Sequence, residues 1–362
     1  MPLPRRLALT ALLVALPLSG RAAELKVLSW GGEFSAAQQA AFARPFTQAT
    51  GIAVDIVDAE SPTALIKSQV TAGNVTFDLA SVGLADAVRL CDEGLALPID
   101  HRALAPGADG SPAAQDFLPG TLGPCFVPTD VYATVIAYDA SRPGGAPQTI
   151  ADFFDVTLFP GRRGLLKEPR FTLEMALMGD GVPADQVYAT LSTPQGLDRA
   201  FAKLDQIRRN AVWWEAGSQP VQLLADGEVA MTMAYNGRIF AAQIDEDRPF
   251  RILWDGQVYE TEGWMIPKGA PNPEEALRFV AWTTAPEPLA RAAEQLSYGP
   301  PRRSSQALVG VYARDGKTPM APHLPTTPEN MKNALAIDTG FWVDHDAELT
   351  ERFAAWLAGA DE

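Results

Sequence analysis

The feature that most constrains this chain is a regular alternation of strand and helix patterns between residues 24 and 93. Strands are expected at 24–30, 52–57 and 77–82, where apolar residues alternate or cluster in short runs. The segments between them predict helices, and Ser61 followed by Pro62 is typical of a helix start. This order predicts an α/β fold with a mostly parallel sheet covered by helices. Such sheets bind ligands outside the carboxyl ends of their strands.

A second region of the same character lies between residues 160 and 250. It has predicted strands at 164–166, 211–214 and 229–235 and predicted helices at 173–178 and 219–226. Segments 132–138 and 263–267 are expected to cross between the two regions, and further helices are expected at 273–283 and 348–357. Two lobes with more than one crossing enclose a cleft that can close by a hinge motion.

The first 23 residues have the pattern of a secretory signal peptide. Arg5 and Arg6 precede an apolar run at 7–16, and small residues follow at Ala22 and Ala23. The run is shorter than the ~20 residues that span a bilayer, so we expect no stable membrane insertion. We expect residues 1–23 to be removed and the mature protein to be periplasmic, by either the general or the twin-arginine route. The alternative is a buried N-terminal helix.

The composition limits the partners of the chain. Its 29 basic and 44 acidic residues give a net charge of −15, which disfavours nucleic acid because phosphate groups would be repelled. The three histidines are far apart, so we expect no metal site. We expect Cys91 and Cys125 to form a disulfide in an oxidising compartment; the alternative is two buried thiols.

Motifs of common enzymes are absent from the sequence. It has no G-x-S-x-G elbow, no phosphate-binding loop of the G-K-S/T kind and no H-E-x-x-H motif. Gly31-Gly32 lacks the third glycine of a dinucleotide site. We therefore expect neither an enzyme nor a cofactor. A secreted hydrolase with paired carboxylates such as Glu168 and Glu262 stays open as an alternative.

A set of short motifs occurs in the order found in bacterial extracellular solute-binding proteins. The motifs lie at 26–32, 50–54, 73–79, 91–95, 226–231, 235–237, 264–269 and 298–300. The later ones resemble the spermidine/putrescine-binding branch, and the resemblance extends over essentially the whole mature chain. It implies a monomeric receptor of an ABC importer, with a membrane permease as partner, no catalysis and a two-lobed periplasmic-binding-protein fold of type II.

On this resemblance we predict the lobe boundaries. The first lobe comprises residues 24–135 and 264–310, and the second comprises 136–263 and 311–362, with the hinge between them. A related fold binds ferric iron through adjacent tyrosines. The corresponding residues here are Trp213 and Trp214, which cannot ligate a metal, so this alternative is less favoured.

The resemblance also implies a small linear amine held between aromatic faces and carboxylates. The site residues that it implies, together with their neighbours, are Trp30, Glu60, Ser61, Glu168, Gln219, Tyr235, Tyr259, Glu260 and Glu262. Glu262 corresponds to the principal amine-binding carboxylate of the branch. Some of these residues have structural alternatives: Ser61 and Gln219 could cap helices, and Trp30 and Tyr235 could belong to the core.

Three positions depart from the polyamine pattern. Phe171 replaces a second acid, and 83–85 has glycine and aliphatic residues in place of a hydroxyl and an aromatic. Arg238 replaces a small residue. An arginine would repel a dication but could hold a carboxylate with two hydrogen bonds, so Arg238 and Glu262 indicate an ω-amino acid of the 4-aminobutyrate type. Alternatively, Arg238 pairs with Asp226 or Glu262, and polyamine and ω-amino acid both stay open.

Overall fold

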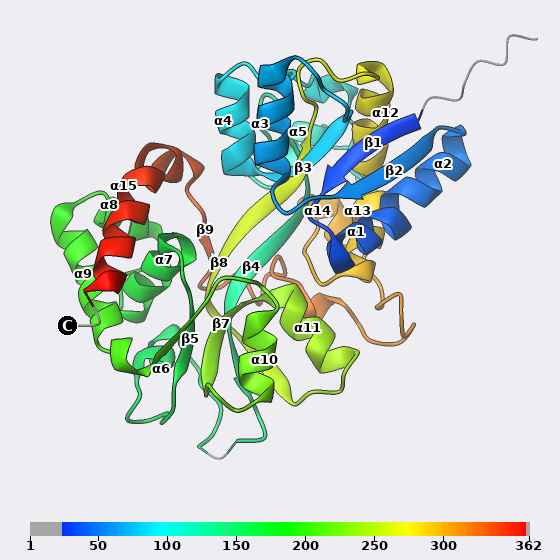
Figure 1. Cartoon of the computed structure of the whole chain (residues 1–362). Helices are drawn as coiled ribbons and strands as arrows, with labels where there is room; N and C mark the ends of the chain where they lie inside the picture. Colours follow the sequence, from blue (N-terminus) through cyan, green and yellow to red (C-terminus); the bar gives the residue numbers. More distant parts are fainter. Residues whose placement is uncertain (1–23, 143, 360–362) are drawn as a thin grey trace, which may run out of the picture.

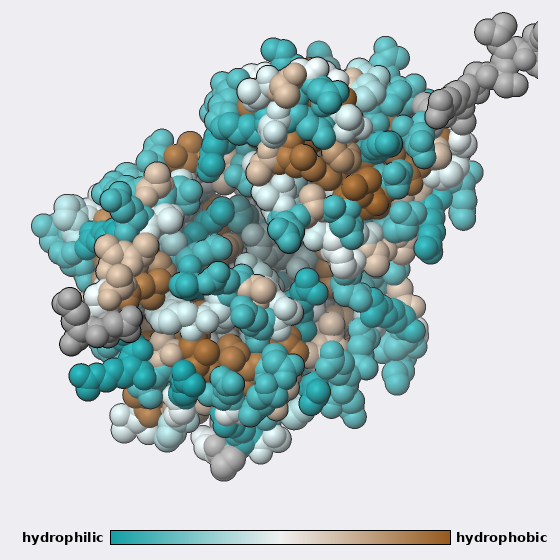
Figure 2. Space-filling view, viewed as in Figure 1, coloured by the Kyte–Doolittle hydropathy of each residue, from teal (hydrophilic) through white to brown (hydrophobic). Residues whose placement is uncertain are grey.

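The computed structural model describes residues 24–142 and 144–359, which form two lobes joined by two long strands (Figure 1). These crossing strands are β4 (Val127–Asp139) and β8 (Phe250–Met265), which pair antiparallel. Between the two lobes the molecular surface is hollowed (Figure 2). The predicted signal peptide, residues 1–23, lies outside the described residues.

In the first lobe, β1 (Glu24–Ser29) lies between β2 (Ala53–Asp58) and β3 (Leu79–Gly83), parallel to both. β3 pairs antiparallel with the end of β8. The helices are α1 (Gly32–Gln38), α2 (Arg44–Thr50), α3 (Pro62–Ala72), α4 (Leu84–Asp92), α5 (Ala113–Asp116), α12 (Pro273–Thr283), α13 (Pro286–Gln295) and α14 (Arg303–Gln306). A π-helical turn at Gln39–Ala43 joins α1 to α2, and a 3₁₀ turn lies at His101–Ala103.

The second lobe has β5 (Arg163–Leu166) between β6 (Ala211–Trp214) and β7 (Met231–Tyr235), again parallel to both. Its helices are α6 (Ile150–Phe154), α7 (Pro169–Gly179), α8 (Val187–Leu191), α9 (Pro194–Asp205), α10 (Gln219–Ala225), α11 (Asn236–Ile244) and α15 (Thr339–Ala358). The short β9 (Leu335–Ala336) pairs with β8. Three 3₁₀ turns lie at Ala184–Gln186, Arg208–Asn210 and Ala321–His323.

The two lobes share one sheet but have separate apolar cores. The strand order is β2-β1-β3-β8-β4-β7-β5-β6, so β8 and β4 lie at its centre. In the first core, Phe46 meets Phe279 edge to face at 5.1 Å, and in the second Trp214 and Trp342 are buried. A buried side chain of this size contributes about 1.5–3 kcal/mol through burial, so each lobe has its own source of stability. The lobes can therefore move as two bodies.

The expected α/β fold is confirmed, but the sheet is mixed rather than mostly parallel. β4 and β8 run antiparallel to each other, and also to β7 and β3 respectively, because each carries the chain from one lobe to the other. The second crossing was wrongly expected only at 263–267; it begins at Phe250. Gly256, with φ +77°, interrupts the apolar pattern of β8. Because both strands belong to both lobes, the boundaries at 135/136 and 263/264 stay a prediction.

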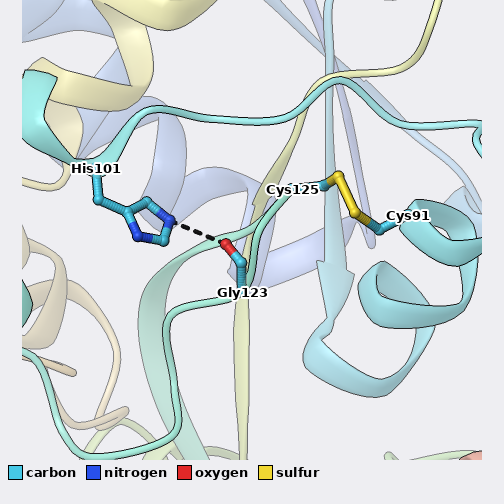
Figure 3. Close-up of a disulfide and its surroundings, with 4 residues drawn as sticks. All are labelled: Cys91, His101, Gly123 and Cys125. Carbon is cyan, nitrogen blue, oxygen red and sulfur yellow. Dashed lines mark hydrogen bonds between the residues drawn. A yellow bond between two sulfur atoms is a disulfide. The ribbon is translucent and has the colours of Figure 1, made fainter.

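The expected disulfide is confirmed (Figure 3). Cys91 lies in α4 and Cys125 just before β4, and their Cα atoms are 5.8 Å apart. Nearby, His101 Nε2 and the carbonyl oxygen of Gly123 form a 2.9 Å hydrogen bond (Figure 3). The disulfide thus ties α4 of the first lobe to the segment that leads into the crossing strand β4.

The second lobe contains a carboxyl group in its core. Glu174 of α7 is fully buried, and its Oε1 accepts hydrogen bonds from Trp342 Nε1 (2.7 Å) and the Tyr188 hydroxyl (3.1 Å). Its Oε2 has no partner among the described residues. Burial raises the pKa of Glu174 from 4.5 to about 7, although both donors oppose this shift. The folded state therefore favours the protonated acid.

We predict that Glu174→Gln reduces the pH dependence of stability. Since the pKa of Glu174 is higher in the folded state, its stabilising effect is present below pH 4.5 and is lost as the pH rises through 7. Between pH 5 and pH 8 the wild type should lose about 2.5 kcal/mol of unfolding free energy relative to the variant. Urea denaturation of both proteins at both pH values measures this change. If the unfolding free energies of wild type and variant differ by the same amount at pH 5 and at pH 8, the raised pKa of Glu174 is contradicted.

Candidate functional site

Four polar side chains lie together near the start of β4 and the end of β8. In the antiparallel register of β4 and β8, Asp130 lies opposite Glu262 and Tyr132 lies opposite Glu260. Residues two apart in a strand share a face of the sheet, so the four side chains form one patch. Asp130, Glu260 and Glu262 are buried, with Glu262 9 % exposed. We call this patch, Asp130, Tyr132, Glu260 and Glu262, the floor.

Hydrogen bonding differs among the three carboxylates of the floor. Glu260 accepts hydrogen bonds from the Tyr132 hydroxyl (2.9 Å) and from Arg170 Nη1 (3.3 Å). Glu262 Oε2 accepts one from the indole Nε1 of Trp30 at 3.0 Å. Asp130 Oδ2 accepts one from the neighbouring Thr129, whereas its Oδ1 has no partner among the described residues. Only Glu260 is thus paired with a cation among the residues that the structure describes.

The electrostatics of the floor favour a positively charged ligand. Burial, followed by the charges of Asp130 and Glu260, raises the pKa of Glu262 well above its usual value. Burial likewise raises the pKa of Asp130 to about 7, although the hydrogen bond from Thr129 opposes it. A cationic group bound here would relieve the repulsion and hold both acids ionised.

Aromatic rings line the same part of the molecule. The ring of Tyr132 lies 5.8 Å from that of Tyr235, 6.0 Å from Tyr298 and 6.3 Å from Phe171, centroid to centroid. Trp30, at the end of β1, is 37 % exposed. The faces of such rings attract ammonium groups by about 0.5–2 kcal/mol each.

The end of β3 leaves space beside the floor because it is a glycine. A Cβ atom on Gly83 would lie 3.4 Å from Glu260 Oε1 and 3.7 Å from Glu262 Oε1. Any larger side chain there would enter the space that both carboxylates face. The next residue, Leu84, lines a pocket of about 400 Å³ together with Thr121, Tyr259, Glu260 and Asp338. This pocket continues from the floor toward the start of α15.

Three of the expected site residues are brought together by the structure. Trp30 contacts Glu262 directly, from opposite ends of the sequence. The half-buried ring of Tyr235 lies against Tyr132, and the charges of Glu168 and Glu260 help to raise its pKa, after burial. Their contact with a ligand stays a prediction.

The other expected site residues lie farther out or have local partners. Glu60 and Ser61 are exposed, and Ser61 Oγ accepts the N–H of Ala64, which caps α3. Gln219 Oε1 accepts the N–H groups of residues 215 and 216, both at 2.8 Å, and so closes the turn before α10. Helix capping, the structural alternative, therefore occurs for Ser61, whereas Gln219 closes the preceding turn without capping α10.

Among the described residues, no hydrogen bond or ion pair joins Glu168, Arg238 or Tyr259 to Glu262, whose side chain is bonded by Trp30. Glu168 is exposed at the start of α7, yet partial loss of hydration raises its pKa, with Arg170 opposing. Arg238 is exposed on α11 and forms no ion pair with Asp226 or Glu262 in the described structure. Tyr259 lines the neighbouring pocket. The roles of all three stay predictions.

Four residues of the site were not expected from the sequence: Asp130, Tyr132, Arg170 and Tyr298. A signal existed for the first two, because polar residues two apart interrupt an apolar strand, as Glu260 and Glu262 do. Tyr298 lies in a motif that carried the resemblance but had no assigned role. For Arg170 no local pattern pointed to the site.

Within residues 24–142 and 144–359, no helix is long and apolar enough to cross a membrane. No group of three His, Cys, Asp or Glu side chains in the same ranges is arranged to hold a metal ion. Comparison with known proteins shows that the sequence profile of the bacterial extracellular solute-binding proteins matches residues 41–326. The chain belongs to this family.

This solute-binding protein is 42 % identical to a gamma-aminobutyric acid-binding protein of Pseudomonas aeruginosa, over 98 % of this chain and 96 % of the relative. Among solved structures, an ABC transporter substrate-binding protein from Bradyrhizobium japonicum has a TM-score of 0.82 at 31 % identity, over 92 % of this chain and 99 % of that one. A solved structure described as a GABA receptor has a TM-score of 0.78 at 30 % identity, over 92 % of this chain and 97 % of that one.

These likenesses confirm the two-lobed periplasmic-binding-protein fold with its hinge, and the resemblance on which the expected function rests. The solute-binding protein is therefore related to receptors of transporters rather than to hydrolases. The ferric-iron receptor and the secreted hydrolase, the two alternatives, are not favoured by any of these relatives.

Proposed function

We propose that this protein captures a small linear amine in the cleft between its lobes and delivers it to the permease of an ABC importer. The observation that carries the proposal is Glu262, a buried carboxylate whose hydrogen-bond partner is the Trp30 indole. The receptor works without catalysis, as a monomer in the periplasm, after loss of residues 1–23.

The amine is bound where charge and ring faces coincide. Its ammonium group donates hydrogen bonds to Glu262 and lies near Asp130, whose pKa is also raised by burial. Charge-assisted hydrogen bonds of this kind contribute about 1.5–3 kcal/mol each. The rings of Tyr132, Tyr235 and Trp30 cover the methylene chain.

An ω-amino acid of the 4-aminobutyrate type is the favoured ligand, and a polyamine is the second candidate. Two of the relatives bear names that refer to gamma-aminobutyric acid. The departures at Phe171 and Gly83 remove groups that the polyamine branch uses, which supports the same choice.

Isothermal titration of ligand-stripped protein tests the proposal. We expect 4-aminobutyrate to bind with a dissociation constant in the micromolar range or below, and putrescine and spermidine to bind more weakly. Native mass spectrometry of protein purified without stripping should detect the same amine. Absence of heat with all three ligands would defeat the amine assignment.

A further inference from the structure

Arg170 places a cation at one end of the floor. Its guanidinium is 29 % exposed and reaches the floor through a single hydrogen bond, from Nη1 to Glu260 Oε1 at 3.3 Å. A guanidinium has five N–H donors in a fixed plane, so this contact leaves most of them available. Glu260 does not depend on Arg170 alone, because the Tyr132 hydroxyl also donates to it.

An uncommon turn of the backbone holds Arg170 in this place. Phe171 has φ 69° and ψ −42°, a backbone conformation with positive φ that is unfavourable for a residue other than glycine. Arg170 itself is extended, with ψ 139°, so the regular part of α7 begins only after Phe171. The buried ring of Phe171 packs against Tyr132 and lies 6.0 Å from the guanidinium carbon. The turn at Phe171 directs the guanidinium of Arg170 toward the floor. The packing of the Phe171 ring against Tyr132 offsets the energetic cost of the turn.

The two ends of the floor therefore differ in charge, because Arg170 borders the Glu260 end. Arg170 opposes the raised pKa of Glu260, whereas the charges acting on Glu262 are the acids Asp130, Glu260 and Asp86. Residues two apart in a strand are separated by about 7 Å. Since Arg170 Nη1 lies 3.3 Å from Glu260, a ligand joining Glu262 to Arg170 bridges on the order of 10 Å. Two hydrogen bonds and a chain of four carbons span such a gap.

We propose that Arg170 is the residue that selects ligands with a carboxylate, by exchanging Glu260 for the carboxylate of the bound molecule. This inference rests on the proposed function, in which Glu262 holds the ammonium end. The planar guanidinium matches a carboxylate with two parallel hydrogen bonds. The second ammonium of a diamine would instead meet the positive guanidinium. The substrate class is thus ω-amino acids rather than diamines.

Titration with two matched ligands tests this role. The probes are 4-aminobutyrate and its neutral amide, 4-aminobutanamide, which share the ammonium end and the chain length. Wild type should prefer the acid by about 100-fold. In Arg170→Met the preference should fall below about 5-fold, mainly through loss of affinity for the acid, and the relative affinity for putrescine should rise. Arg170→Lys should keep part of the preference.

Further variants separate this role from folding. Arg170→Met/Glu260→Gln removes both charges of the pair, so it avoids an unpaired buried acid, and should show the same loss of preference. Arg199→Met, which breaks the exposed pair with Asp180, should keep the wild-type preference. An equal loss of affinity for acid and amide in Arg170→Met, or a loss of preference in Arg238→Met but not in Arg170→Met, would overturn the inference. Failure of wild type to bind any of the amines would instead defeat the proposed function, and this inference with it.

Discussion

Replacing Glu262 by glutamine should weaken the binding of 4-aminobutyrate by about 100-fold or more. The variant keeps an acceptor for Trp30 Nε1 but removes the charge that opposes the ligand ammonium. Truncating one partner of a buried, hydrogen-bonded charge pair typically costs about 2–5 kcal/mol of binding free energy, which gives the expected size. Because the pKa of Glu262 is raised, isothermal titration of both proteins at pH 8, where more of Glu262 is ionised than at neutral pH, measures the change.

The free variant should be at least as stable as the wild type. Burial and two neighbouring acids raise the pKa of Glu262, so its ionised form is disfavoured in the absence of ligand. A loss of binding without a loss of melting temperature would then come from the site and not from unfolding. Glu174→Gln is the matched control, since it makes the same exchange at a buried acid outside the floor. Full affinity in Glu262→Gln would show that the amine is held elsewhere.

Removal of the disulfide should lower the free energy of unfolding by about 4 kcal/mol. The bond between Cys91 and Cys125 closes a loop with a sequence separation of 34 residues, which restricts the unfolded chain. Urea denaturation of Cys91→Ala/Cys125→Ala should therefore show an earlier midpoint than that of the oxidised wild type. Reductant should destabilise the wild type by a similar amount.

The same double variant provides the control for reductant, because it has no disulfide to reduce and should be unaffected by it. Its affinity for 4-aminobutyrate should stay within about 3-fold of wild type in buffer without urea, since neither cysteine lies in the floor. A wild type whose stability is the same with and without reductant would contradict a stabilising bond.

Much of the fold was predictable from the sequence. Strand and helix patterns between residues 24 and 93 are regular, and Ser61-Pro62 begins α3 as expected. The second crossing was the main error, because β8 carries Gly256 and three acids (Asp255, Glu260 and Glu262) where a buried strand usually has apolar residues. Because of these interruptions, the alternation of apolar and polar residues does not predict the full strand of 16 residues.

The site was predictable only where a resemblance or a strand end pointed to it. Trp30 and Glu262 were expected and are in contact, although 232 positions separate them in the sequence. Arg170 was missed because its place depends on the positive-φ turn at Phe171, which no local propensity indicates. Local hydrogen bonding explains why Ser61 and Gln219 were ambiguous, since a polar residue that begins a helix has the same signal as one that binds a ligand.

The unbroken course of β4 and β8 has a consequence for the order of events in uptake. Since Asp130 pairs with Glu262 and Tyr132 with Glu260 across these two strands, the spacing of the floor is set by the pairing of β4 with β8 and not by the helices of either lobe. A solute can therefore dock first on the ribbon, from open solvent, and be covered afterwards. The encounter rate would then be set by the field of Asp130, Glu260 and Glu262, and the residence time by how long the lobes remain shut.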